Sequence, residues 1–216
     1  MTLSYDLYWS FRLPYSYMVT PRLLALEQAY DVVCNVRPVY PLAVRTPEFF
    51  EQQDPLWVRY LMVDVFREAA FLGLPFRWPR PDPVQRSPDE GYRMKQPHIH
   101  RLTHLGVAAA QRGRGLPFIA AVSRTIWSGE VDNWHEGDHL ARAADLAGLD
   151  FTELAAAVDA DPAAYAAVVE ENQTAQRAAG HWGVPMMVFG GEPFFGQDRF
   201  DQLKWRMQAQ GLTRRS

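Results

Sequence analysis

The stretch that decides the fold is residues 4–17, Ser-Tyr-Asp-Leu-Tyr-Trp-Ser-Phe-Arg-Leu-Pro-Tyr-Ser-Tyr. Residues 4–11 are rich in aromatic side chains, which favours a strand. Pro14 follows, and proline is tolerated in a first helical turn because its missing N–H would have no partner there. Apolar residues continue to about Tyr30, and residues 32–40 predict a second strand. This order predicts two parallel strands joined by a right-handed crossover.

The middle of the chain, from about residue 46 to residue 180, has a helical character. Residues 74–91 are rich in proline and arginine and predict a long loop. Asp161-Pro162 predicts a helix start, since aspartate is a good N-cap and proline a good first helical residue. The predicted helices cover residues 55–73, 96–113, 117–127, 136–147, 152–158 and 161–179.

The C-terminal part returns to strands. Residues 184–189 and 192–195 predict two short strands joined by Gly190-Gly191, a signal for a tight turn. Asp198 is then expected to cap a final helix that reaches about residue 210.

The complete order, strand-helix-strand, helices, strand-strand-helix, resembles the thioredoxin pattern with an insertion. We therefore predict an α/β, thioredoxin-like fold with a large all-helical insertion domain. Residues 1–45 and 178–216 form the discontinuous thioredoxin-like domain, and residues 46–177 form the inserted one.

Composition excludes several classes of function. The 216 residues carry a formal net charge of -3, which gives no basic excess for binding nucleic acid. Cys34 is the single cysteine, so an intramolecular disulfide, a Cys-x-x-Cys redox pair and a multi-cysteine zinc site are excluded. It lies in a predicted strand, where a free cysteine is usually a buried apolar residue.

The first residues carry no pattern of a signal peptide, and no stretch approaches the roughly 18 apolar residues of a membrane span. We therefore expect a soluble, cytoplasmic protein that acts without a membrane.

Three segments, in this order, resemble the 2-hydroxychromene-2-carboxylate isomerases and kappa-class glutathione transferases of the DsbA-like branch of the thioredoxin fold. They are residues 7–17, residues 183–185 (Gly-Val-Pro) and residues 196–201 (Gly-Gln-Asp-Arg-Phe-Asp). The resemblance covers essentially the whole chain. It implies glutathione as the cofactor, a small aromatic substrate and a homodimer.

The first segment carries the catalytic candidates. At the position where these glutathione enzymes carry the serine that bonds the cofactor thiolate, this chain has Leu13, which can neither attack nor donate. Ser16, one helical turn on, is one substitute, and the alternative is that its hydroxyl only bonds within that turn. Arg12, Tyr15 and Ser10 are the other nearby donors. A site that binds without catalysing is the remaining possibility.

The other two segments imply the cofactor contacts. The resemblance predicts a cis bond before Pro185, with the backbone of Val184 bonding the peptide-like cofactor; the alternative is a trans proline at a strand start. Gln197 and Asp198 would hold the γ-glutamyl end, with Asp198 accepting from the ammonium group. Asp198 can be a helix N-cap at the same time.

Three further features have both a functional and an ordinary interpretation. Arg45 suits a carboxylate, of substrate or glycyl origin, or is simply solvated. His100 and His104 have the i,i+4 spacing of a metal pair, although a histidine face without metal is favoured, and we predict no metal site. An aromatic substrate would suit walls made of Trp127, Trp134, His135, His181 and Trp182.

The leading hypothesis is a glutathione-dependent isomerase acting on a hydroxychromene-type or related carboxylate of aromatic degradation. The alternatives are a kappa-like glutathione transferase, and a redox-inactive binding protein that has lost its nucleophile. Disulfide exchange by this chain alone is excluded.

Overall fold

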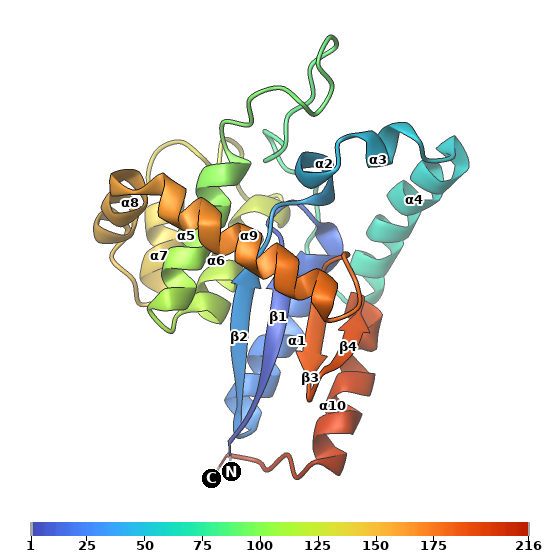
Figure 1. Cartoon of the computed structure of the whole chain (residues 1–216), viewed down its shortest axis with the longest axis vertical. Helices are drawn as coiled ribbons and strands as arrows, with labels where there is room; N and C mark the ends of the chain where they lie inside the picture. Colours follow the sequence, from blue (N-terminus) through green and yellow to red (C-terminus); the bar gives the residue numbers. More distant parts are fainter. Residues whose placement is uncertain (1, 216) are drawn as a thin grey trace.

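The computed structural model describes residues 2–215 and contains a four-stranded sheet with the strand order β2-β1-β3-β4 (Figure 1). β1 pairs in parallel with β2 and antiparallel with β3, and β3 pairs antiparallel with β4. The helical insertion lies between β2 and β3 in the sequence. The predicted thioredoxin-like fold with a helical insertion is confirmed.

The opening strand-helix-strand unit forms as predicted: β1 is Leu3–Trp9, α1 is Pro14–Ala29 and β2 is Val32–Pro38. Both strands end earlier than expected, with Trp9 paired to Pro38 as the last pair of the ladder. The second strand stops at Pro38 rather than at residue 40; Pro41 follows closely, and proline donates no ladder hydrogen bond. Pro14 occupies the first turn of α1, and Leu13 precedes it in an extended conformation without capping it.

The insertion contains eight helices within the described residues. α5 and α9 pack against β2, and α6 packs against both α1 and β2, whereas α2 to α4 lie on the other side of the upper end of the sheet (Figure 1). Asp161 caps α9, because its carboxylate accepts from the N–H of Ala164. The helices are α2 Leu42–Arg45, α3 Glu48–Glu51, α4 Pro55–Phe71, α5 Ile99–Gln111, α6 Gly115–Trp127, α7 His139–Leu146, α8 Phe151–Ala160 and α9 Pro162–Ala178.

The C-terminal part forms the predicted hairpin, with β3 at Met186–Phe189 and β4 at Glu192–Phe195. Its turn residues, Gly190 and Gly191, both have positive φ angles (58° and 81°), which favour glycine.

The prediction that Asp198 caps the last helix is wrong. The chain first makes a 3-10 turn, η1 Gln197–Arg199, and α10 is Phe200–Ala209. The residues before η1 and before α10 are Gly196 and Arg199, and neither makes a side-chain cap. Asp198 lies inside the turn, where its carboxylate pairs with the adjacent Arg199 at 3.6 Å.

A single hydrophobic cluster joins the sheet to the insertion. It contains Leu7 of β1 and Val36 of β2 together with Leu105 of α5 and Ile119 of α6. The division into two domains at residues 45/46 and 177/178 stays a prediction, because the two parts share this core. Cys34 is buried as expected, and burial raises the pKa of its thiol.

No helix among residues 2–215 is both long enough and apolar enough to cross a membrane.

Candidate active site

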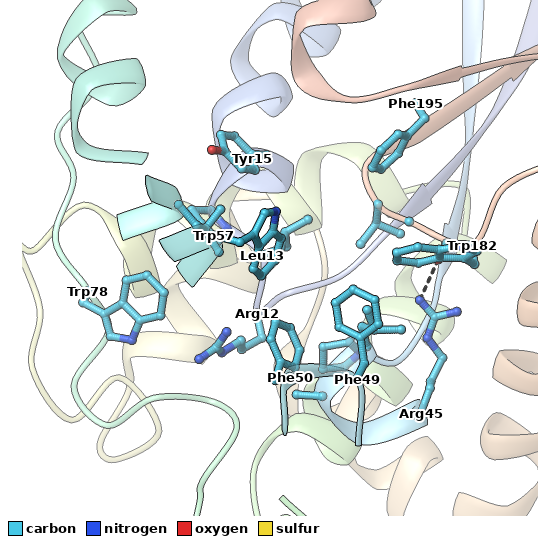
Figure 2. Close-up of a pocket in the computed structure, with 17 residues that line it drawn as sticks. Arg12, Leu13, Tyr15, Arg45, Phe49, Phe50, Trp57, Trp78, Trp182 and Phe195 are labelled. Carbon is cyan, nitrogen blue, oxygen red and sulfur yellow. Dashed lines mark hydrogen bonds between the residues drawn. The ribbon is translucent and has the colours of Figure 1, made fainter. Parts of the chain in front are cut away.

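A cavity of about 180 Å³ opens beside the N-terminus of α1 (Figure 2). Its walls come from the start of α1, from α2, α3 and α4, from the segment before β3 and from the end of β4. Residues far apart in the sequence therefore meet here. The lining includes Arg12, Leu13, Pro14, Tyr15, Arg45, Phe49, Phe50, Trp57, Trp78, Trp182, Gly183, Val184 and Phe195.

The walls are largely aromatic. The ring of Phe49 lies 5.3 Å from that of Trp182, 5.2 Å from that of Phe50 and 6.2 Å from that of Trp57. Trp57, Trp182 and Phe195 remain about two-fifths exposed. Open aromatic faces around a cavity suit a flat, apolar ligand.

Of the aromatic residues predicted to form walls, only Trp182 lines this cavity. His181 stacks behind it, 5.1 Å from Trp182 and 3.8 Å from Phe195. Trp127 and Trp134 are core residues whose indole N–H groups donate to the carbonyl groups of Phe11 and Pro81. His135 also lies away from the cavity and packs on Trp134 and His98.

The structure places Leu13 in the cavity wall and Ser16 outside it. Ser16 is fully buried, and its hydroxyl has no hydrogen-bond partner among the described residues. In this structure the hydroxyl therefore reaches neither the cavity nor a partner within the first turn, and its role as a thiolate donor stays a prediction. Ser10, also fully buried without a partner for its hydroxyl, is no better placed.

Arg12 lines the cavity, but its charge is already paired. Its Nε and Nη2 donate to the two carboxylate oxygens of Asp82 at 3.1 and 2.9 Å. Asp82 also accepts from the indole N–H of Trp78 and the N–H of Val84. The guanidinium of Arg12 is thus fixed as part of the wall.

Tyr15 presents its ring to the cavity, while its hydroxyl donates to Asp64 of α4 at 2.5 Å. Burial, and next this hydrogen bond, raise the pKa of Tyr15. The hydroxyl stays protonated and committed to Asp64, so it is not a free donor.

The bond between Val184 and Pro185 is cis, which confirms the prediction. Val184 lines the cavity. Within residues 2–215, neither its N–H nor its C=O makes a hydrogen bond, although the carbonyl groups of Gly183 and Pro185 on either side are bonded to Gln176 and to the N–H of Gly196. Both peptide groups of Val184 therefore remain available.

Gln197 and Asp198 lie at the start of η1, next to the cavity but not in its lining. Gln197 is buried and bridges two helices: its Oε1 accepts from Arg22 of α1, and its Nε2 donates to Glu68 of α4 at 2.6 Å. The carboxylate of Asp198 is 61% exposed. Of the two, only Asp198 has an exposed side chain that a ligand could reach, and this carboxylate already pairs with Arg199.

Arg45, at the end of α2, is not the solvated side chain that its sequence context suggests. It is half-buried in the cavity wall, and burial lowers the pKa of its guanidinium to about 10. Its partners are neutral: the side-chain oxygen of Gln176 at 3.3 Å and the carbonyl of Trp182 at 2.9 Å.

The predicted histidine face packs against tyrosine. Nε2 of His104 lies 2.7 Å from the hydroxyl of Tyr40, and the ring of His100 lies 4.9 Å from that of Tyr40. Among the described residues, no group of three or more His, Cys, Asp or Glu side chains could hold a metal ion.

The family model of the DSBA-like thioredoxin domain matches residues 5–208. The chain belongs to this family. No curated protein matches it significantly.

Three proteins of known structure resemble this DsbA-like chain over at least 95% of its length. A 2-hydroxychromene-2-carboxylate isomerase shares 20% identity at a TM-score of 0.71, over 96% of this chain and 95% of that one. A probable DsbA oxidoreductase from Streptomyces coelicolor shares 21% sequence identity at a TM-score of 0.66, over 96% of this chain and 90% of that one. The cytosolic disulfide reductase DsbM from Pseudomonas aeruginosa shares 16% sequence identity at a TM-score of 0.61, over 96% of this chain and 100% of that one. The structure of DsbM with GSH shares 15% sequence identity at a TM-score of 0.59, over 95% of this chain and 100% of that one. At these identities the likeness concerns the fold.

This DsbA-like protein has no thiol in its cavity, because Cys34 lies in β2 and lines a different groove. Sequence reasoning did not find the aromatic side chains of α3, or the carboxylates of Asp64 and Asp82 that engage Tyr15 and Arg12. No local pattern marks them, since they reach the cavity only through the packing of the insertion against α1.

Proposed function

We propose that this DsbA-like protein is a glutathione-dependent isomerase that acts on a carboxylate of the kind formed in aromatic degradation. The observation that carries the proposal is the cavity between the N-terminus of α1 and Val184, whose two peptide groups lack partners within the described chain. A peptide-like thiol would add to Val184 in the manner of a β-strand.

The residues of the cavity fit such a cofactor. The single cysteine is buried elsewhere, so a thiol must come from a bound molecule. The first turn of α1 has no acidic residue, and the N–H of Tyr15 makes no hydrogen bond within residues 2–215. A thiolate above this turn would gain that N–H and the positive end of the helix dipole.

The other end of glutathione would lie toward η1. The N–H of Gly196 bonds the carbonyl of Pro185 at 2.9 Å, so the start of η1 lies directly beside the proline turn. The exposed carboxylate of Asp198 would accept from the γ-glutamyl ammonium group. Gln197, with Arg22 and Glu68, would hold η1 in place rather than touch the cofactor.

When bound, glutathione supplies a thiol that adds to a conjugated double bond of the substrate and leaves again after rotation, so no atom is gained or lost. The chain's own part is to orient sulfur against substrate and to exclude water. The aromatic walls at Phe49, Trp57 and Trp182 would hold the flat substrate, and positioning of this kind accounts for much of enzymatic rate enhancement.

Two alternatives have their own support. A kappa-like glutathione transferase would use the same aromatic walls for an electrophilic acceptor. A redox-inactive binding protein would explain Leu13, which leaves no side-chain donor at the sulfur position. The glutathione-containing structure of DsbM and the isomerase neighbour support glutathione as the ligand and isomerisation as the reaction.

We further propose a cytoplasmic homodimer. Support comes from α4, which exposes Leu56, Tyr60, Val63 and Phe71 at 60% or more. Since large apolar patches are rarely left open on monomers, a second copy would cover this helix. Light scattering measures the mass of the particle in solution, and a monomer at micromolar concentration contradicts this part.

The decisive experiment titrates glutathione into the wild-type protein and into Asp198→Ala by calorimetry, and then assays isomerisation of 2-hydroxychromene-2-carboxylate with and without glutathione. Binding that Asp198→Ala weakens, with turnover that requires glutathione, supports the proposal. Conjugation without isomerisation favours the transferase, and binding without either reaction favours the binding protein. The absence of binding at millimolar glutathione contradicts the isomerase and the transferase and favours the binding protein.

A further inference from the structure

The two arginines of the cavity differ in how their charge is compensated. Arg12 shares both oxygens of Asp82, and the pair is closed to a further anion. Arg45 makes no ion pair with any carboxylate among the described residues. Its Nε is buried and has no hydrogen-bond acceptor.

A half-buried guanidinium without an anion is costly, because arginine keeps its proton and loses water on burial. The neighbouring side chain of Arg177 adds repulsion, and the carboxylate of Glu170 offsets part of the cost without coming within ion-pair distance of Arg45. Breaking a buried ion pair leaves the same situation and destabilises proteins strongly. An anionic ligand that bound next to the guanidinium of Arg45 would remove this cost, which gives a reason for an unpaired arginine in the cavity wall.

The chain also fixes where this guanidinium points. The carbonyl of Trp182 accepts from its Nη2 and the side chain of Gln176 accepts from its Nη1. Gln176 in turn donates to the carbonyl of Gly183 at 2.7 Å. The cation is thus tied to the segment that carries Val184, and it lies at the opposite end of the cavity from Arg12 (Figure 2).

Aromatic rings lie next to this cation. Trp182, whose carbonyl holds Arg45, has its ring 5.3 Å from that of Phe49, and both line the cavity. A ligand with its ring against Phe49 and Trp182 would direct an attached carboxylate toward the guanidinium, whose planar fork matches a carboxylate.

We propose that Arg45 binds the carboxylate of the anionic ligand in this cavity and so selects aromatic carboxylates over neutral aromatic compounds. The inference deepens the proposed function by naming the anchor of its substrate. The same carboxylate chemistry exists in the glycyl end of glutathione, so the test separates the two sources.

The test uses 2-naphthoate and its neutral counterpart 2-naphthamide as probes, in the absence of glutathione. Their dissociation constants are measured by tryptophan fluorescence for wild type, Arg45→Met and Arg45→Lys. A charge-assisted hydrogen bond contributes about 1.5–3 kcal/mol, so Arg45→Met should weaken naphthoate binding by roughly 10- to 100-fold. Arg45→Lys should restore part of the loss, and naphthamide should bind both variants and the wild type equally weakly.

Arg177→Met is the matched control. Arg177 is an exposed residue of α9 near Arg45 and does not line the cavity. Its substitution removes one positive charge at similar range but leaves the proposed contact intact, so naphthoate affinity should stay within about twofold. An equal loss in the two arginine variants would mean that general attraction, and not a contact with Arg45, holds the anion.

Glutathione and its glycyl monoethyl ester are then titrated into wild type and Arg45→Met. If Arg45→Met weakens naphthoate but not glutathione, the substrate supplies the carboxylate. If it weakens glutathione but neither the ester nor naphthoate, Arg45 holds the glycyl carboxylate of glutathione instead, and the selection of aromatic carboxylates is overturned. Unchanged binding of both acids overturns the inference.

A failure of the proposed function can be told apart from a failure of this inference. The proposed function is contradicted by a lack of glutathione binding or turnover, whereas the binding of naphthoate needs no thiol. If Arg45→Met does not fold, the wild type still decides, because equal affinity for naphthoate and naphthamide overturns the inference without any variant.

Discussion

The two ends of the cavity each contain an arginine and other polar groups, but these groups differ in whether they already have a bonding partner. At the α1 end, the side chains of Arg12 and Tyr15 are each bonded to a carboxylate from the insertion, Asp82 or Asp64. At the β3 end, formed by Arg45 and Val184, the guanidinium lacks an anion and the peptide groups lack partners within the described chain. The comparison teaches that the side chains of the α1 end hold the fold together and leave only backbone N–H groups for a ligand, while the β3 end also offers a side-chain charge without a paired anion.

The largest expected effect is on stability at the α1 end. Asp82→Ala leaves Arg12 and the indole N–H of Trp78 without their acceptor, at side-chain exposures of 16% for Arg12 and 24% for Asp82. Removing one partner of such a pair should lower the free energy of unfolding by about 3 kcal/mol, measured by urea denaturation. Asp132→Ala is the control, because its pair with Arg77 is largely exposed and should contribute less than about 1 kcal/mol. Similar losses in both variants would mean that the pair of Arg12 and Asp82 contributes no more stability than an exposed ion pair.

Leu13→Ser tests whether a hydroxyl group that donates to the thiolate of glutathione is what the α1 end lacks for faster catalysis. A hydroxyl here should lower the pKa of bound glutathione, read from thiolate absorbance against pH, and raise the isomerase rate by about tenfold. Leu13→Ala removes the same leucine without adding a donor and should do neither. Equal behaviour of the serine and alanine variants would contradict a role for the hydroxyl.

Tyr15→Phe should lower the free energy of unfolding by about 1 kcal/mol at neutral pH, because Asp64 loses a hydrogen bond. The pH dependence has a definite sign. The pKa of Tyr15 is raised in the folded state, so its contribution is complete below the ordinary tyrosine pKa of about 10. It is lost as the pH rises from there toward the higher folded value. The wild type should therefore lose stability more steeply above pH 10 than Tyr15→Phe, measured by urea denaturation at stepped pH; parallel slopes would contradict the assignment.

The smallest effect is expected for Ser16→Ala. The hydroxyl of Ser16 is buried without a partner, so its removal should leave activity within about twofold and stability unchanged or raised by up to about 1 kcal/mol. A loss of activity of 100-fold, measured beside Leu13→Ser, would return Ser16 to the catalytic site.

Much of the fold follows from local patterns along the chain. Pro14 after an aromatic strand, Asp161-Pro162 and Gly190-Gly191 act on their own neighbours through φ angles and capping, and the structure confirms the elements that they predict. Asp198 is the exception, because nothing local indicates that a 3-10 turn precedes α10.

The sequence by itself determined the strand-helix-strand order and the absence of a redox cysteine pair, and its resemblance to a known family predicted the cis bond at Val184–Pro185. Only the tertiary structure decided which polar groups remain available. Arg12 and Arg45 are the same residue type, but Asp82 pairs with Arg12, whereas no carboxylate of residues 2–215 forms an ion pair with Arg45. The physical reason is that availability depends on partners brought together by packing over tens of residues, whereas helix and strand signals act within a few.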